Sequence, residues 1–274
     1  MLKELLTPEQ LKKIENVLMP VEKIALEDLN LPYEVRGSID HAIIVKNRIV
    51  QFCSEDYGLR TNEEILDNFL EFLISNKVPI SEINGINHRN SRFRMDIIIG
   101  DKSENISKKV IDPVKMGLRI YNSYDGSQKF MFSAGIYRLV CLNGLSVLDE
   151  TFSMKKTHTM QIYDGVDLSE SLAKIAMVME QFNDMTALYH DLSNFKVYSL
   201  ETRMREVIEA TNYPVSLLDG ALERAQLELE LGYPKSDWVV YNGLNFMLNH
   251  GNDSYLGRKF EKMDREILKF LLEC

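Results

Sequence analysis

The sequence predicts an α+β protein with a β-rich, mixed N-terminal body and an all-helical C-terminal half. Up to about Lys156, apolar and polar residues alternate over short stretches, which is typical of half-buried strands. Beyond Lys156, apolar residues recur every three or four positions, which is typical of amphipathic helices. We therefore expect an α+β domain with antiparallel hairpins over residues 1–160 and a helical region packed on it over residues 161–274.

The first expected element is a helix that begins after Thr7. Thr7 is a suitable N-cap, Pro8 fits the first helical position, and Gln10 stands where a capping box needs it. Leucine and isoleucine residues then follow at helical spacing until Pro20 ends the run.

Two strands and a second helix come next. Residues 41–53 are rich in β-branched residues and predict two short strands joined at Lys46–Asn47. Thr61 and Glu64 form another capping box, which opens a helix that reaches about residue 76.

A further pair of strands is expected over residues 83–87 and 92–100. In the second strand, apolar residues alternate with charged ones, so one face is apolar and the other is partly charged. Residues 101–116 are polar and interrupted by proline, and we expect them to form one long loop.

A β-hairpin follows, with its turn at Asp125–Gly126, because glycine accepts the positive φ that such turns require. This turn would place Tyr121 opposite Phe130 on one side of the sheet. Arg119 would then lie opposite Phe132 on the same side. Aromatic rings interleaved with a guanidinium suit the stacking of unpaired bases. The alternative is that the aromatic side chains belong to the core and Arg119 lies at its rim.

The second half contains five expected helices. The first is capped by Asp167 and carries an apolar face as far as Tyr189. The others cover residues 199–211, 216–231, 236–249 and 257–273. In the third of these, Trp238 and three asparagines lie along one side, and we interpret them as packing and capping residues.

The charge of the chain is unevenly distributed. The 274 residues carry a net charge of −9, yet residues 86–156 hold twelve Lys/Arg and seven Asp/Glu, a balance of +5 that leaves −14 elsewhere. A basic segment in an acidic protein indicates a face for an anionic partner, although charge also fluctuates along any chain.

The densest basic cluster contains Arg89, Arg92 and Arg94. Arg92 and Arg94 should project from one strand face about 7 Å apart, which is close to the phosphate repeat of a nucleic-acid strand. The alternative is a solvated edge strand whose charges prevent edge pairing. Lys108 and Lys109 could contact phosphate from the long loop, or be merely solvated.

A short motif with Arg138, Cys141 and Asn143 follows the hairpin. A nucleophilic cysteine needs a nearby base and a cationic setting, and no histidine is close in sequence. We therefore expect Cys141 to be buried and inert, and Asn143 to support a turn.

Several classes of protein are disfavoured. The three cysteines form no Cys-x-x-Cys unit, the five histidines are scattered, and neither a phosphate-binding nor a dinucleotide-binding glycine motif is present. No apolar run is long enough to span a bilayer, and the N-terminus lacks a secretion signal. We expect no metal, no cofactor and no catalytic residue, no membrane association, and a cytoplasmic location.

Four stretches resemble the domain-of-unknown-function 932 family, found mostly in phages and plasmids. They read NSYDGS, RLVCLNGL, RIVQFCSEDYGLRTNEEI and DWVVYNGLNFMLNH, and together they cover about residues 40–250. Family members commonly have a glycine in the early strand where this chain has Gln51–Phe52. The resemblance implies a mobile-element protein of unassigned chemistry, and many phage genes of this kind act on DNA.

The basic segment, the aromatic hairpin and the resemblance together favour a protein that binds or anneals single-stranded nucleic acid without catalysis. An anti-defence or host-protein-binding module is the alternative, and a metal-dependent nuclease is the third interpretation. Homo-oligomer formation stays open. The residues expected to contact nucleic acid are Arg89, Arg92, Arg94, Lys108, Lys109, Arg119, Tyr121, Lys129 and Phe130.

Overall fold

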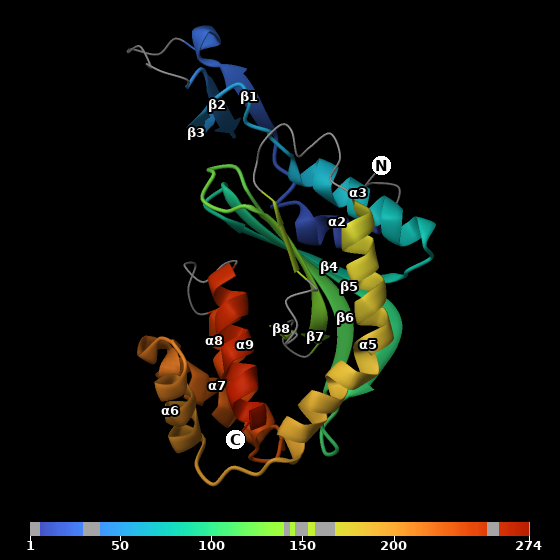
Figure 1. The fold of residues 1–274 in the computed structure, drawn as a ribbon, viewed down its shortest axis with the longest axis vertical. Helices are drawn as coiled ribbons and strands as arrows, with labels where there is room; N and C mark the ends of the chain where they lie inside the picture. The colour runs from blue at the N-terminus through green and yellow to red at the C-terminus, as the bar shows by residue number, and fades with distance from the viewer. Residues whose placement is uncertain are drawn as a thin grey trace. The chain divides into compact units, whose positions relative to one another are not determined.

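The structure is a computed structural model that describes residues 6–29, 39–139, 143–145, 153–156, 168–250 and 258–273 (Figure 1). Its N-terminal half contains two antiparallel sheets and its C-terminal half contains helices, so the predicted α+β class is confirmed.

The chain forms two compact units. Unit 1 comprises residues 1–100, 118–133 and 153–172, and unit 2 comprises residues 101–117, 134–152 and 173–274. The domain boundary that the sequence predicts near residue 160 stays a prediction.

The N-terminal half contains two short helical segments, a longer helix and nine strands within the described residues. In chain order they are α2 (Pro8–Ile14), β1 (Val21–Ala25), the 3-10 helix η1 (Leu26–Asp28), β2 (His41–Val45), β3 (Arg48–Cys53), α3 (Asn62–Ser75), β4 (Ile80–His88), β5 (Arg92–Asn105), β6 (Pro113–Ser123), β7 (Phe130–Arg138), β8 (Asn143–Leu145) and β9 (Ser153–Lys156).

Both predicted capping boxes are present. At α2, the Thr7 hydroxyl accepts a hydrogen bond from the Gln10 backbone, and the Gln10 side chain accepts one from the Thr7 backbone. Thr61 and Glu64 make the same reciprocal pair at α3. Each box satisfies backbone N–H groups that the first turn of a helix leaves without a partner.

The strands form one sheet of order β1-β2-β3 and another of order β4-β5-β6-β7-β8, in which β9 also pairs with β7. The predicted turn at Lys46–Asn47 joins β2 to β3, with both residues at positive φ. In unit 1, α3 packs on the second sheet, and the rings of Phe69 and Phe132 stack at 5.1 Å. The strand β9 has no counterpart among the predicted elements.

The prediction of a long loop over residues 101–116 is wrong. The strand β5 continues to Asn105 and β6 begins at Pro113, which leaves only residues 106–112 between them. The Asn105 side-chain amide stabilises this connection, because it donates to the Ser107 carbonyl at 2.5 Å and accepts from the Asp112 N–H. Proline is tolerated at Pro113 because the first residue of a strand need not donate to the ladder.

The predicted hairpin is present, but its connection is longer than two residues. The strand β6 ends at Ser123 and β7 begins at Phe130. Gly126 has φ of +67°, as the turn prediction requires. The Ser123 hydroxyl donates to the Gln128 carbonyl at 2.8 Å and accepts from the Gln128 N–H at 3.1 Å, so a side chain bridges the strands beside the turn.

The helices of the C-terminal half agree with the predicted ranges. They are α5 (Leu168–Asn194), α6 (Leu200–Ala210), the 3-10 helix η3 (Val215–Leu217), α7 (Leu218–Glu230), α8 (Asp237–His250) and α9 (Arg258–Glu273). Asp167, the predicted cap of the first, lies outside the described residues.

Helix α8 forms the centre of the helical part of unit 2. Its residues from Asp237 to Asn245 are all buried, and α7 and α9 pack against it. Gly243 allows α7 to approach closely, because a Cβ at this position would lie 2.6 Å from the Ala221 carbonyl oxygen.

Candidate nucleic-acid interface

Two connections of the second sheet are held together at one end of unit 1. The Ser91 hydroxyl and the Arg92 Nε both donate to Oδ2 of Asp125, at 2.9 and 3.1 Å. The Tyr124 N–H donates to the Ser91 carbonyl at 2.7 Å. The β4–β5 turn and the β6–β7 connection therefore lie side by side.

Asp125 is the residue that organises this end of the sheet. Partial burial raises the pKa of its carboxyl, but hydrogen bonds from Ser127, Ser91 and Arg92 outweigh this effect and hold the pKa below its usual value. Asp125 is thus a carboxylate at neutral pH, and it offsets the positive charge of Arg92.

Exposed cations surround these connections. Arg89 is exposed in the β4–β5 turn with φ of 56°, and Lys129 is exposed just before β7. A Cβ added at Gly126 would lie 2.8 Å from the Gln51 amide, so β3 also reaches this end of unit 1. Arg48 begins that strand and is exposed as well.

The structure buries two of the predicted guanidinium groups. Arg94 and Arg119 are each 3% exposed, and both contact Asp96. Their Nε atoms lie 3.2 and 2.8 Å from its carboxylate oxygens. Arg92 and Arg94 were expected to share one accessible strand face, but only Arg92, with 36% of its side chain exposed, is reachable by solvent.

The predicted stacking residues are buried too. Tyr121 is 1% exposed and Phe130 is 6% exposed. These values agree with the alternative interpretation, in which the hairpin aromatics belong to the core. A base cannot stack on a ring that neighbouring side chains already cover, so in this conformation Tyr121 and Phe130 present no stacking surface.

The remaining predicted residues, Lys108 and Lys109, belong to unit 2. Both are exposed in the β5–β6 connection, and Lys108 Nζ lies 3.3 Å from Oδ1 of Asn194. The predicted set is therefore divided, with the cations of the two hairpin connections in unit 1 and this lysine pair in unit 2.

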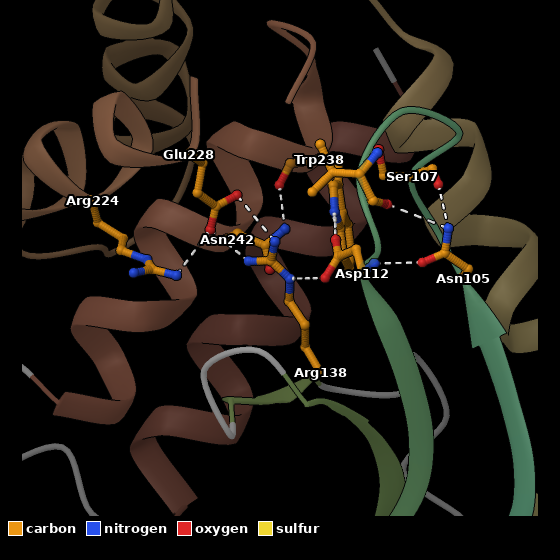
Figure 2. Close-up of polar contacts among 9 residues, drawn as sticks. Asn105, Ser107, Asp112, Arg138, Arg224, Glu228, Trp238 and Asn242 are labelled. Atoms are coloured by element: carbon orange, nitrogen blue, oxygen red, sulfur yellow. Dashed lines mark hydrogen bonds and ion pairs between the residues drawn. The ribbon is translucent and has the colours of Figure 1, made fainter. Parts of the chain in front are cut away.

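The arginine of the RLVCLNGL motif is the centre of a buried polar network in unit 2 (Figure 2). Arg138 donates through Nε to Oδ1 of Asp112 at 2.6 Å, and through both terminal nitrogens to the Glu228 carboxylate. The side chains of all three residues are 0% exposed. Arg138 therefore cannot contact an external phosphate.

Two aromatic residues and a second arginine complete this network. The Trp238 indole N–H donates to Oδ2 of Asp112 at 2.8 Å, and the Arg138 guanidinium lies over the rings of Trp238 and Tyr233. Burial raises the pKa of Tyr233 to about 12. Arg224 lies 3.4 Å from the Glu228 carboxylate.

Burial also raises the pKa of Glu228, although Arg138 and Arg224 oppose this shift. The network joins β7, the β5–β6 connection, α7 and α8 within unit 2. Its donors and acceptors are directed at one another, so we interpret it as a structural network. The sequence indicated Arg138 and Trp238 separately, but it carried no signal for Asp112 or Glu228 as their partners.

The asparagines of α8 are also structural, as predicted. Asn242 donates to the Trp238 carbonyl at 2.7 Å, and Asn249 donates to the Asn245 carbonyl at 3.0 Å. Asn245 donates to the buried Asp264 of α9, which also accepts from the Tyr241 hydroxyl. Asn245 and Tyr241 thus connect α8 to α9, whereas the bonds of Asn242 and Asn249 lie within α8.

Some predictions cannot be compared with the structure. Cys141 lies outside the described residues, and Asn143 is placed only as the first residue of β8.

Within the described part of the chain, no three His, Cys, Asp or Glu side chains are arranged to hold a metal ion. None of the helices seen there is long and apolar enough to cross a membrane.

One protein-family model matches this chain. No curated protein and no solved structure matched the chain. The family model described as "Domain of unknown function (DUF932)" matches residues 50–256, which include the hairpin, the Arg138 motif and helix α8. The matched region covers well over half of the sequence, and the chain therefore belongs to the DUF932 family.

Proposed function

We propose that the protein binds single-stranded nucleic acid, without catalysis, through the exposed cations at the turn end of unit 1. The observation that carries this proposal is that hydrogen bonds from Ser91 and Arg92 to Asp125 hold together the two connections on which the exposed Arg89 and Lys129 lie. Cations on adjacent turns can follow a phosphate backbone, and such contacts need no base sequence.

The buried members of the predicted set have a supporting role in this proposal. Arg94 and Arg119 bind Asp96 inside the sheet, and Tyr121 and Phe130 pack there. They hold the strands whose connections carry the exposed cations. Two of the twelve Lys/Arg residues of the segment 86–156 are thereby buried, and we expect a small phosphate footprint.

The test is a fluorescence polarisation titration of a labelled thirty-nucleotide single strand, and of its duplex, at several salt concentrations. Replacing two phosphate-binding cations should reduce the slope of log K against log salt by about 1.4, since each single-strand phosphate contact contributes about 0.7. The test variant is Arg89→Asn with Lys129→Gln, because asparagine tolerates the positive φ at residue 89.

The matched control is Lys77→Asn with Lys12→Gln, which removes the same charge. Lys77 also has positive φ, and it follows the C-terminus of α3. This helix has 14 residues, and at its N-terminus the backbone N–H of Asn62 donates to the Tyr124 hydroxyl beside the interface. Lys77 is therefore about 20 Å from the proposed interface. Equal weakening by both variants, or no binding by wild-type protein at low salt, would refute the proposal.

A further inference from the structure

Arg92 differs from its neighbouring cations at the turn end of unit 1, because its guanidinium is held in place. Its Nε donates to Oδ2 of Asp125 at 3.1 Å, and the same oxygen accepts from the Ser91 hydroxyl at 2.9 Å. The exposed side chains of Arg89 and Lys129, by contrast, make no hydrogen bond or ion pair with any described residue. Arg92 is therefore the fixed cation of this surface.

Asp125 is a rigid support for that guanidinium. Its side chain is 18% exposed, and its other carboxylate oxygen accepts from the Ser127 N–H at 3.0 Å. Ser91 and Ser127 hold the carboxylate from two different connections, so the orientation of Arg92 is set before a ligand arrives. A side chain that already has its binding orientation loses less conformational entropy when the ligand binds.

The terminal nitrogens of Arg92 are left for other acceptors. Nε is occupied by Asp125, and among the described residues neither terminal nitrogen has a hydrogen-bond partner. The side chain is 36% exposed. The paired N–H groups of a guanidinium match two oxygens of a phosphate group, whereas the ammonium of lysine acts as a point charge.

We propose that Arg92 binds one phosphate of the nucleic-acid backbone through both terminal nitrogens, and that Asp125 is the positioning residue that presents it. This inference rests on the proposed function and adds to it. One phosphate is recognised by geometry, whereas Arg89 and Lys129 contribute charge alone. Every phosphodiester has two non-bridging oxygens, so the contact needs no base sequence.

Arg92→Lys separates geometry from charge, because it retains the positive charge and removes the paired nitrogens. The slope of log K against log salt should therefore stay unchanged. Binding of a thirty-nucleotide single strand should nevertheless weaken about tenfold, which corresponds to about one hydrogen bond to a charged group. The matched control is Arg89→Lys, which should bind like wild type; positive φ at residue 89 is no obstacle, since Lys77 also has it.

Asp125→Asn distinguishes positioning from charge by the sign of its effect. The asparagine oxygen can still accept from the Ser127 N–H, but the amide nitrogen cannot accept from Arg92. If charge alone mattered, loss of a carboxylate beside a bound phosphate would strengthen binding by about threefold. We expect binding to weaken instead, by about threefold or more, in about 0.15 M salt, where screening limits the charge effect.

The double variant tests whether Asp125 acts through Arg92. Once lysine replaces Arg92, the added Asp125→Asn should weaken binding little further, because the guanidinium that it positions is gone. General damage to the turn would instead multiply the two losses. Melting curves of all four proteins show whether each variant is folded.

These outcomes separate the inference from the proposed function. If wild-type protein does not bind the strand at low salt, both are refuted. If wild-type protein binds with the expected salt dependence, any of three results overturns the inference alone: Arg92→Lys binds as tightly as wild type, Asp125→Asn binds more tightly, or the losses of the two substitutions multiply.

Discussion

Replacing Arg138 with methionine should strongly destabilise unit 2. The side chains of Arg138, Asp112 and Glu228 are completely buried, and Arg138 bonds both carboxylates. Methionine fills much of the same space but leaves two buried carboxylates without their shared cation. Removing one partner of a buried ion pair costs about 3–5 kcal/mol. With an m-value of about 2 kcal/mol/M, the urea midpoint should fall by about 2 M.

Trp238 provides the assay, because the only tryptophan of the chain donates its indole N–H to Asp112 inside this network. Its fluorescence in a urea titration therefore reports the unfolding of the region that the substitution perturbs. The control is Arg205→Met, which removes an ion pair with Glu201 in which both side chains are more than half exposed. An exposed helix pair of this kind contributes about 0.5 kcal/mol or less.

The destabilisation should also grow with pH. Burial already raises the pKa of Glu228 above its ordinary value, and loss of the Arg138 charge removes the largest opposing effect. A carboxyl whose pKa is higher in the folded protein than in the unfolded chain costs no stability at a pH below its unfolded pKa. As the pH rises from there through the folded pKa, the carboxyl ionises more readily in the unfolded chain, and the folded protein loses stability. The deficit of Arg138→Met should thus be larger at pH 8 than at pH 5.

Adding Glu228→Gln to Arg138→Met should recover part of the loss, since it removes one buried charge. An Arg138→Met protein that unfolds within about 1 kcal/mol of Arg205→Met, or whose deficit is the same at both pH values, would contradict this view of the network.

Three further predictions concern packing and hydrogen bonds. Gly243→Ala should lower the melting temperature because the new Cβ would meet the Ala221 carbonyl, and this outweighs the preference of about 1 kcal/mol that alanine has for helices. The control is Gly220→Ala, whose Cβ would meet only a flexible methionine side chain, and it should be close to neutral. Equal effects of the two substitutions in circular dichroism melts would contradict this. Thr61→Ala should cost about 1 kcal/mol in urea unfolding followed by circular dichroism, through loss of the capping box; no loss would contradict the cap. Tyr124→Phe should cost about 1–3 kcal/mol in the same assay, because its hydroxyl accepts a buried backbone N–H at 2.8 Å, and an unchanged midpoint would argue against that bond.

Local features of this chain were predictable because they depend on residues that are near one another in sequence. The capping boxes at Thr7 and Thr61 need a hydroxyl and a carboxyl or amide three residues apart. The turn at Lys46–Asn47 and the C-terminal helices follow from residue types and apolar spacing within one segment. The same holds for the hairpin around Gly126.

The candidate interface was only partly predictable. Alternation along β5 shows that a strand has two different faces, but it does not show how far a given face is covered. Arg92 and Arg94 are two residues apart in the same strand, yet Arg92 reaches solvent whereas Arg94 is buried against Asp96. Tyr121 and Phe130 are buried as well, and nothing in the alternation of their own strands indicates this.

The sequence alone thus determined the fold class, the family resemblance and most secondary structure, which depend on short-range patterns. Tertiary structure alone decided which charges remain at the surface. Arg138 is bound to carboxylates 26 and 90 residues away, and no pattern within one segment records such pairs. The exposure of Tyr198 and Leu227 likewise depends on which helices leave them uncovered. Burial is a property of the assembled core, because it depends on every element that packs around a side chain.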